Sequence, residues 1–133
     1  MLYCRFAAYS ALTLFEMTTV FLPPDELEFV DRGFGLSPLH APSDCIFSFV
    51  RSYADGSELA LTFEVGSATA LRASLMKQGK ILSDVVADYL TGVSFQSWHG
   101  ERTIRCAFSA RSLEMDLRIH FDPVASLHFS ALS

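Results

Sequence analysis

The stretch Leu113-Glu114-Met115-Asp116-Leu117-Arg118-Ile119-His120-Phe121 alternates five apolar residues with four polar or charged residues, without a break. Successive side chains of a β-strand point to opposite faces, so this period of two predicts a strand with one buried side and one solvent-facing side. The solvent-facing side carries Glu114, Asp116, Arg118 and His120. We expect the fold to be organised around the sheet that contains this strand.

Residues 125–132 are the expected partner of this strand, because only Asp122-Pro123-Val124 separates the two. A three-residue loop places apolar residues opposite apolar residues, whereas a two-residue loop does not. The expected pairs are Phe121 with Ala125, Ile119 with Leu127 and Leu117 with Phe129. The chain is therefore predicted to end in an antiparallel hairpin with one apolar face and one polar face.

The polar face of this hairpin is the first candidate site. In the predicted register Arg118 faces His128 and His120 lies diagonal to it, while Glu114 and Asp116 are expected to be solvated. Two histidines beside an acid could hold a metal ion, but Arg118 lies between them and repels a cation. We therefore expect this face to contact a partner and to hold no metal.

A second hairpin is predicted at residues 45–65 around Ala54-Asp55-Gly56. A two-residue turn would place the phenylalanines of the first strand opposite polar residues. A three-residue loop with Gly56 in the left-handed conformation places apolar residues opposite each other instead. The expected pairs are Phe47 with Phe63, Phe49 with Leu61 and Cys45 with Val65.

A third hairpin is predicted to join residues 93–98 to residues 103–109. Its tip holds the densest group of polar and aromatic residues in the chain, Trp98, His99, Glu101 and Arg102. A tryptophan beside a turn commonly covers the end of a core, but aromatic and charged side chains together are also typical of protein interfaces. We include this tip in the candidate partner-binding surface.

Two short helices are expected outside the hairpins. Residues 23–30 begin with two prolines and acidic residues and are followed by Gly33, the pattern of a helix start and stop, and Leu27, Phe29 and Val30 would form its buried edge. Residues 83–91 contain apolar pairs at helical i, i+4 spacing and precede a glycine. His40 lies in the loop between the first helix and the second hairpin, where we expect it to be solvated.

Residues 69–77 alternate apolar and polar side chains and predict a further strand. The predicted fold class is α+β: a mostly antiparallel, curved β-sheet of about six or more strands with two short helices. The chain of 133 residues fits one domain, and it is half hydrophobic, with twelve phenylalanines, so it can bury a core without disulfides or a structural metal.

The formal charge of −5 and the sequence pI of about 5.2 disfavour nonspecific binding to nucleic acid or to an anionic membrane. An acidic protein is better matched to a basic partner. The simpler interpretation is that a moderate negative charge keeps the domain soluble.

The three cysteines, Cys4, Cys45 and Cys106, are odd in number and lack zinc-site spacing. A reduced, cytoplasmic setting is the simpler interpretation, with Cys45 and Cys106 as free, buried apolar residues of strands.

Residues 1–22 leave three interpretations open. Arg5 followed by an apolar run imitates a secretory signal, but no Ala-x-Ala cleavage site follows. A membrane span needs ~20 apolar residues, and Arg5 and Glu16 leave too short a run between them. We favour the third interpretation, a strand or helix of the core. Met17 would also make an ordinary start, in which case residues 1–16 would be an upstream extension.

Motifs of catalysis are missing from the sequence. It contains no glycine-rich phosphate loop, no Gly-x-Ser-x-Gly, no His-Glu-x-x-His and no EF-hand loop. We therefore expect a protein that is not an enzyme and needs no cofactor.

Residues 44–65 (DCIFSFVRSYADGSELALTFEV) and residues 93–129 together make an acidic, hairpin-rich chain without a catalytic motif. In these general features the chain resembles the immunity proteins of bacterial polymorphic toxin and contact-dependent inhibition systems. The resemblance implies a cytoplasmic bacterial protein that binds one cognate toxin domain, expected to be basic, and blocks its active site or substrate surface. The alternative is a β-rich domain without catalysis that is structural or binds a small ligand, which a large Phe-lined cavity would favour.

Overall fold

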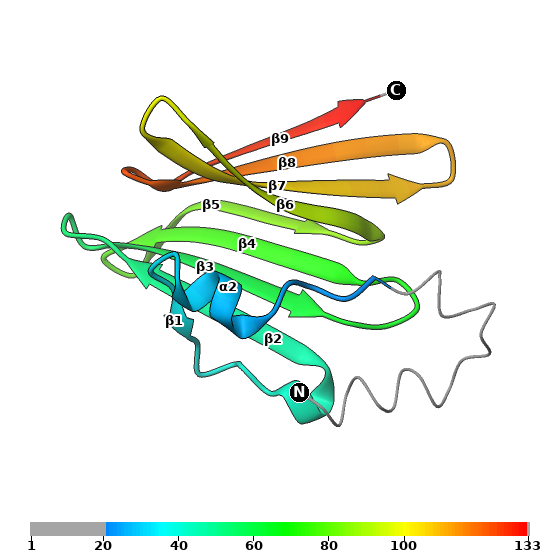
Figure 1. Ribbon diagram of the computed structural model, residues 1–133, viewed down its shortest axis with the longest axis horizontal. Helices are drawn as coiled ribbons and strands as arrows, with labels where there is room; N and C mark the ends of the chain where they lie inside the picture. The colour runs from blue at the N-terminus through cyan, green and yellow to red at the C-terminus, as the bar shows by residue number, and fades with distance from the viewer. Residues whose placement is uncertain (1–20, 133) are drawn as a thin grey trace.

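The computed structural model describes residues 21–132, which form nine antiparallel strands in two sheets (Figure 1). The first sheet has the order β1-β2-β3-β4-β5, with β1 Gly35–Leu36, β2 Ile46–Ser52, β3 Ser57–Glu64, β4 Ala70–Lys77 and β5 Lys80–Ala87. The second sheet has the order β6-β7-β8-β9, with β6 Leu90–Trp98, β7 Glu101–Ala110, β8 Leu113–Asp122 and β9 Ser126–Leu132. The helices of the described residues are α2, Glu26–Val30, and the 3-10 helix η2, Pro42–Asp44.

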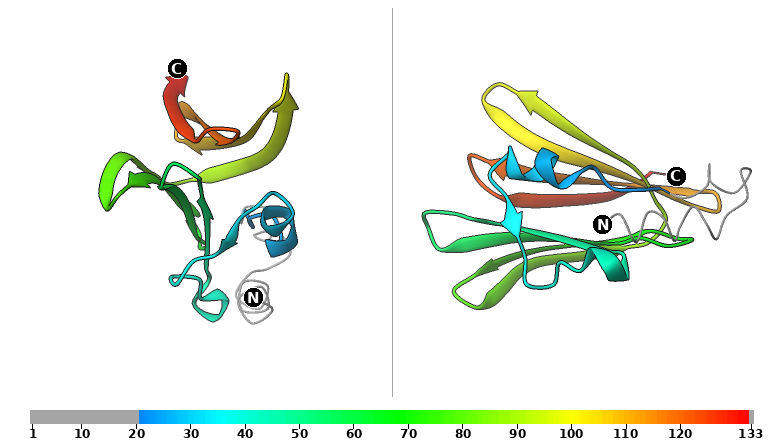
Figure 2. Two further views of the ribbon diagram at one scale, coloured as in Figure 1. Left: turned by 90° about the vertical axis from the view of Figure 1, so that its left-hand side faces the viewer. Right: turned by 60° about the horizontal axis from the view of Figure 1, so that its bottom comes forward.

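The chain passes from the first sheet to the second between β5 and β6. Two residues, Asp88 and Tyr89, separate these strands, and the Leu90 amide donates a hydrogen bond to the Thr69 carbonyl at 2.9 Å. Figure 2 shows the two sheets close together at one end and further apart at the other, where α2 lies beside both. The sheets and α2 therefore enclose one core between them.

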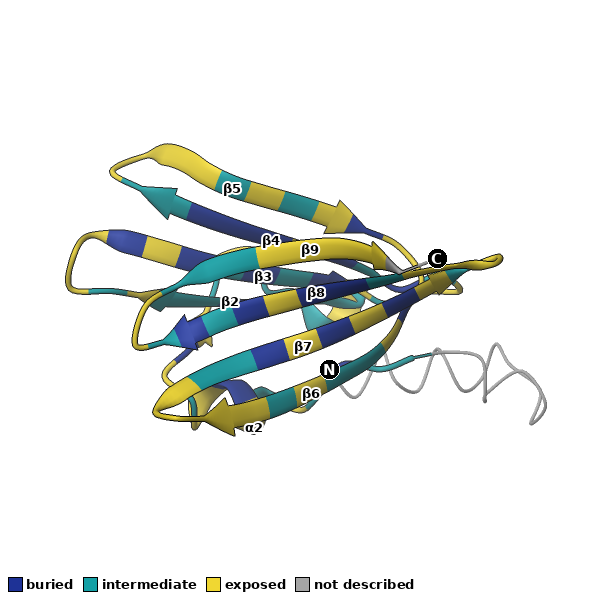
Figure 3. Cartoon of the chain, turned by 90° about the horizontal axis from the view of Figure 1, so that it is seen from above, coloured by how far each residue is buried: buried dark blue, intermediate teal, exposed yellow. Residues whose placement is uncertain are grey.

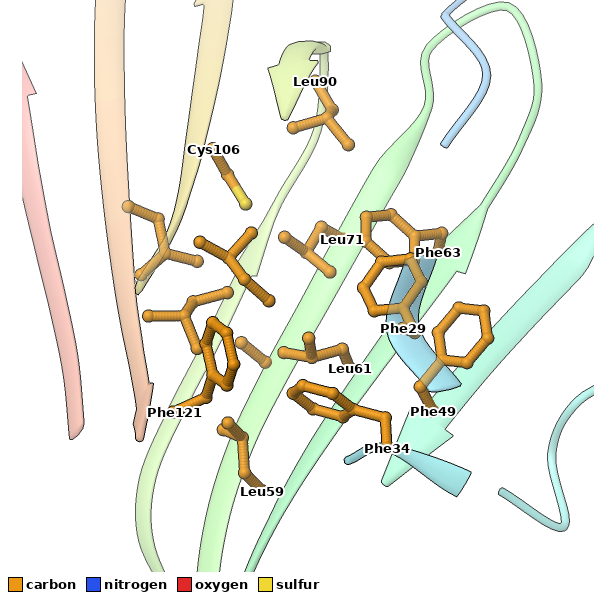
Figure 4. Packing of buried hydrophobic residues seen from close by; sticks show 14 of the residues in the cluster. Phe29, Phe34, Phe49, Leu59, Leu61, Phe63, Leu71, Leu90, Cys106 and Phe121 are labelled. Carbon is orange, nitrogen blue, oxygen red and sulfur yellow. The ribbon is translucent and has the colours of Figure 1, made fainter. Parts of the chain in front are cut away.

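Phe29 of α2 is the residue that joins the three parts of this core. Its ring stacks on Phe49 at 4.1 Å between centroids, lies 5.8 Å from Phe63 in the first sheet and 5.4 Å from Phe95 in the second. Phe29 has no exposed surface, and Figure 4 shows the surrounding rings and leucines packed against one another. Phe29 is the fully buried side chain of α2 and anchors the helix to both sheets.

The strand registers expected from apolar pairing are confirmed. Phe47 pairs with Phe63 in the β2–β3 hairpin, and Leu117 pairs with Phe129 in the β8–β9 hairpin. Gly56 has φ 88°, the left-handed conformation that the three-residue loop requires. The third hairpin is also present, but its turn is shorter than expected, because Trp98 already pairs with Glu101.

The helix predicted at residues 83–91 is wrong. These residues form the second half of β5, the connection to the second sheet and the start of β6. Val85 and Ala87 face the core opposite Ala73 and Leu71 of β4, so the apolar residues follow a period of two here. The β-branched pair Val85-Val86 favours a strand, and pairing with β4 outweighs the i, i+4 coincidence.

The helix predicted at residues 23–30 is present but shorter. It begins after Asp25, and of its expected buried edge only Phe29 is buried, whereas Leu27 is 70% and Val30 47% exposed. At ~3.6 residues per turn, Leu27 projects from nearly the opposite side of the helix to Phe29, and Val30 projects from its flank. The α+β class is thus supported only loosely, since the described residues are mostly antiparallel sheet.

The two described cysteines differ. Cys106 is free and fully buried, and burial raises the pKa of its thiol to about 12. Cys45 is disulfide-bonded, so the expectation of a free thiol at this position is wrong, and the cysteines give no support to a reduced setting. The interpretations of residues 1–22 rest almost wholly on residues 1–20, which lie outside the described residues. Within those residues no helix has the length and apolar character to cross a membrane.

Candidate partner-binding face

The outer face of the second sheet gathers the polar residues that the sequence singled out. Strand β7 alternates buried and exposed residues along most of its length, as Figure 3 shows, because its inner side chains pack on the core. The residues that project outward from the middle of β7, β8 and β9 are Arg105, Asp116, Arg118, His120 and His128, which we call the His-Arg face. The antiparallel pairing of β8 with β7 and with β9 places these five side chains close together.

Asp116 is the centre of this face. Its two carboxylate oxygens accept hydrogen bonds from Arg105 Nε at 2.9 Å and Arg118 Nε at 3.3 Å. Asp116 is only 6% exposed, because the two guanidinium groups cover it. The expectation of a solvated acid is therefore wrong for Asp116. Glu114 lies on the same outer side two residues earlier and is exposed, as expected.

Arg105 was missed by the sequence reasoning. The alternation of Ile104, Cys106 and the residues beside them already indicated that Arg105 points outward. What was missing was the register between β7 and β8, which pairs Arg105 with Arg118. The loop between these strands carries no strong turn signal, so the pairing could not be fixed from the sequence.

The two histidines of the face lie next to each other and next to Arg118. Arg118 pairs with His128 in the β8–β9 register, as expected, and the rings of His120 and His128 are 5.1 Å apart between centroids. His128 Nε2 lies 3.3 Å from Ser126 Oγ, and His120 Nδ1 lies 4.0 Å from a carboxylate oxygen of Glu101. Both rings therefore keep part of their hydrogen-bonding capacity toward solvent.

These side chains line an open depression of about 740 Å³. Its walls are Arg105, Asp116, Arg118, His120, Leu127, His128, Phe129 and Ser130. A second hollow adjoins it at His120 and Arg118 and extends to Trp98 and Glu101 of the third hairpin. The structure thus brings the terminal hairpin and the tip of the third hairpin onto one continuous surface.

The tip residues are only partly brought to this surface. Trp98 is 75% exposed, and its ring lies 4.5 Å from the ring of His99. Arg102 is turned away: its Nε donates to Asp122 Oδ2 at 2.9 Å, and its guanidinium lies over the Phe121 ring. A register irregularity between Arg102 and Thr103 changes the direction of this side chain. Arg102 therefore lies outside the His-Arg face, whereas Asp122 lines a further hollow together with His120 and His128.

Asp122 and its neighbours connect the two sheets. Arg51 of β2 donates to Asp122 Oδ1 at 3.4 Å and to the Arg32 carbonyl at 2.8 Å. The Tyr53 hydroxyl donates to the Phe121 carbonyl at 2.7 Å. Burial raises the pKa of Tyr53 to about 12, with the carboxylate of Asp122 adding to the increase and the Arg51 charge opposing it. This group holds the two sheets together, while the side chains of Asp122 and Arg102 stay partly exposed.

His40 is a further structural group, and its expected solvation is wrong. Only 8% of its side chain is exposed. Nδ1 accepts a hydrogen bond from the Ser48 amide at 3.0 Å, and Nε2 lies 2.9 Å from Glu26 Oε1. His40 thus ties the loop that follows β1 to both β2 and α2, which the sequence pattern of a flexible loop did not indicate.

Charge is divided unequally along the chain. Between residues 21 and 89, ten Asp and Glu oppose five Lys and Arg, whereas between residues 90 and 132 four oppose four. The part of the chain with the first sheet and α2 therefore carries five net negative charges, and the part with the second sheet carries none. The second part also holds His99, His120 and His128.

The described residues contain no group of three or more His, Cys, Asp or Glu side chains placed to hold a metal ion. Each buried side-chain nitrogen or oxygen among them has a hydrogen-bond partner. The described chain is thus a two-sheet antiparallel protein with an open polar surface on one sheet, an arrangement suited to contacting another molecule.

Comparison with known proteins gives a match at the level of structure. No family model matches the chain, and no curated protein matches it. Among solved structures, the chain is similar to a chain of the contact-dependent growth inhibition toxin–immunity protein complex from Klebsiella pneumoniae 342, with a TM-score of 0.69 and 15% identity. The match covers 82% of this chain and 95% of the other. At this identity the likeness establishes the fold, and at that level the resemblance drawn from the sequence is confirmed.

Proposed function

We propose that this chain is an immunity protein that neutralises a cognate bacterial toxin domain by binding it. The observation that carries the proposal is the shared fold with a chain of a toxin–immunity protein complex. Low sequence identity is compatible with this role, because an inhibitor that recognises one partner can change its surface while its core keeps the fold. The bacterial cytoplasm as the place of action follows from the proposal and not from the cysteines.

The surface that we propose for binding is the His-Arg face with Trp98 at its border. Arginine and tryptophan are the residue types that most often dominate binding energy at protein interfaces. Here both are exposed and lie along connected hollows of one sheet face. A basic toxin domain as a whole remains the proposed partner, since the net charge of −5 attracts it at long range.

The alternative of a small-ligand binder has less support. A large Phe-lined cavity would favour it, but Phe29, Phe49 and Phe63 pack ring against ring. The described hollows named above lie on the surface and are lined largely by polar residues. A filled core leaves the outer surface as the place for recognition.

The proposal can be tested with the protein domain encoded immediately upstream of this chain. That domain should arrest growth when it is expressed alone in a bacterial host, and co-expression of this chain should restore growth. The purified pair should form a complex in size-exclusion chromatography and calorimetry. An immunity protein from an unrelated toxin pair is the control and should not protect. Arrest that this chain does not relieve, together with the absence of a complex, would reject the proposal.

A further inference from the structure

We infer that the His-Arg face binds a carboxylate-rich patch of the partner protein, although the chain itself is acidic. The inference rests on the proposed function and names the chemistry that this surface recognises. It departs from the expectation that acids of this face meet a basic surface. The reason is that Asp116, the acid at the centre of the face, is already paired with Arg105 and Arg118 of the same face.

The first argument is the arrangement of the two arginines. Arg105 and Arg118 lie opposite each other on neighbouring strands, where like charges repel. Asp116 between them removes this repulsion and holds each guanidinium through its Nε atom. Within the described residues, no hydrogen bond occupies the terminal Nη atoms, and the two side chains are 45% and 58% exposed. Two half-exposed guanidinium groups are therefore held beside one buried carboxylate, with their Nη atoms left to donate to another molecule.

This arrangement is suited to carboxylates. A guanidinium can donate two parallel hydrogen bonds to one carboxylate, and less conformational entropy is lost when the donor is already held in place. Beside the arginines, His128 and His120 add ring nitrogens along the same depression, and Ser130 adds a hydroxyl at its wall. The depression thus offers a row of donors with one net positive charge from the two arginines and Asp116.

The second argument concerns the class of the partner. A nucleic acid presents a continuous line of phosphates and needs an extended basic surface. Here the positive charge is local: Glu114 and Glu101 border the face, and the part of the chain with the first sheet carries five net negative charges. An acidic patch on a folded protein is small enough to match this surface, and the exposed Trp98 beside it can supply the apolar contact that such an interface needs.

The inference can be tested without the toxin, with hexaglutamate as the probe. In low salt, NMR titration should shift the side-chain Nε–H signals of Arg105 and Arg118 and the ring signals of His120 and His128. Arg118→Gln should weaken hexaglutamate binding on the order of tenfold, because one charge-assisted contact is lost. Arg72→Gln is the matched control, because Arg72 is also an exposed arginine paired with an aspartate, Asp84, but lies in the first sheet. It should leave binding unchanged.

Hexauridylate, a nucleic acid of similar length, tests the other class of partner. Binding as tight as that of hexaglutamate would overturn the inference, and so would equal effects of the Arg118 and Arg72 substitutions. Circular dichroism and core amide signals verify that each variant is folded.

The toxin separates this inference from the proposed function. If the upstream domain binds the wild type, Arg105→Glu with Arg118→Glu should weaken the complex by at least tenfold, on the scale of a lost charge-assisted contact. Unchanged affinity would reject the inference and leave the function standing. Failure of the wild type to bind would reject the function, while the hexaglutamate titration would still decide whether this face recognises carboxylates.

Discussion

The two sheets share one core but differ in what lies on and around them. The first sheet is bordered by α2 and by the His40 loop, and its part of the chain carries the whole negative charge. The part of the chain with the second sheet has no net charge. Its outer face exposes two arginines that cover a buried carboxylate, with two histidines beside them. The same residue types thus serve opposite purposes. His40 and the Arg51–Asp122 pair hold segments of the fold together, whereas the histidines and arginines of the His-Arg face present donors to solvent.

The largest expected effect on the shared core comes from Phe29→Ala. Phe29 contacts aromatic rings of both sheets, so its removal leaves a cavity where α2 meets them. We expect the free energy of unfolding to fall by about 3–5 kcal/mol, as for other large-to-small substitutions of buried phenylalanine. Urea denaturation measures this loss. Leu27→Ala on the same helix is the control and should change stability by less than about 0.5 kcal/mol, because Leu27 is 70% exposed. Equal losses would mean that α2 is not anchored by Phe29.

The second test compares the histidines of the two sheets. His40→Ala removes the acceptor of the Ser48 amide and leaves this buried group without a partner, which costs about 1–3 kcal/mol. His128→Ala removes an exposed ring and should change stability by less than about 0.5 kcal/mol. Thermal and urea unfolding of the two variants should therefore separate clearly. Similar values would show that His40 does not pin the loop, and the distinction between the sheets would fail.

The registers of the hairpins could be predicted from the sequence because apolar pairing is decisive there. A shift by one residue would have moved Phe47 or Leu117 from the core to solvent, so one register is strongly preferred. The outer face of the β8–β9 hairpin followed directly, including the pairing of Arg118 with His128. Local alternation and a short loop were sufficient information for this part of the site.

The features that were missed depend on contacts between segments far apart in the sequence. Residues 83–91 have helical spacing, but their partner β4 decides their conformation. His40 is in a loop rich in turn residues, and its burial depends on Glu26, Ser48 and the phenylalanine rings of β2. Asp116 looked solvated because Arg105 comes from a strand whose register the sequence did not fix. Each error arose where a distant partner, and not the local pattern, sets the environment.

The smallest expected effect concerns a hydrogen bond that joins the two sheets. The Tyr53 hydroxyl donates it to the Phe121 carbonyl. Tyr53→Phe should lower stability by about 1 kcal/mol near neutral pH, the value of one such hydrogen bond. The pKa of Tyr53 is raised to about 12, so the fold favours the neutral phenol. The stabilisation is therefore fully present below pH 10, the ordinary pKa of tyrosine, and is lost as the pH rises from 10 to 12.

The difference in unfolding free energy between wild type and Tyr53→Phe should accordingly shrink across pH 10 to 12, as measured by urea denaturation at each pH. Tyr89→Phe provides the matched control, because Tyr89 is 51% exposed, and it should follow the wild type throughout. A constant difference between wild type and Tyr53→Phe would mean that the hydroxyl is not held neutral between the sheets. The hydrogen bond would then be a surface contact, and the apolar core, the Arg51–Asp122 pair and the Leu90–Thr69 hydrogen bond would join the two sheets without it.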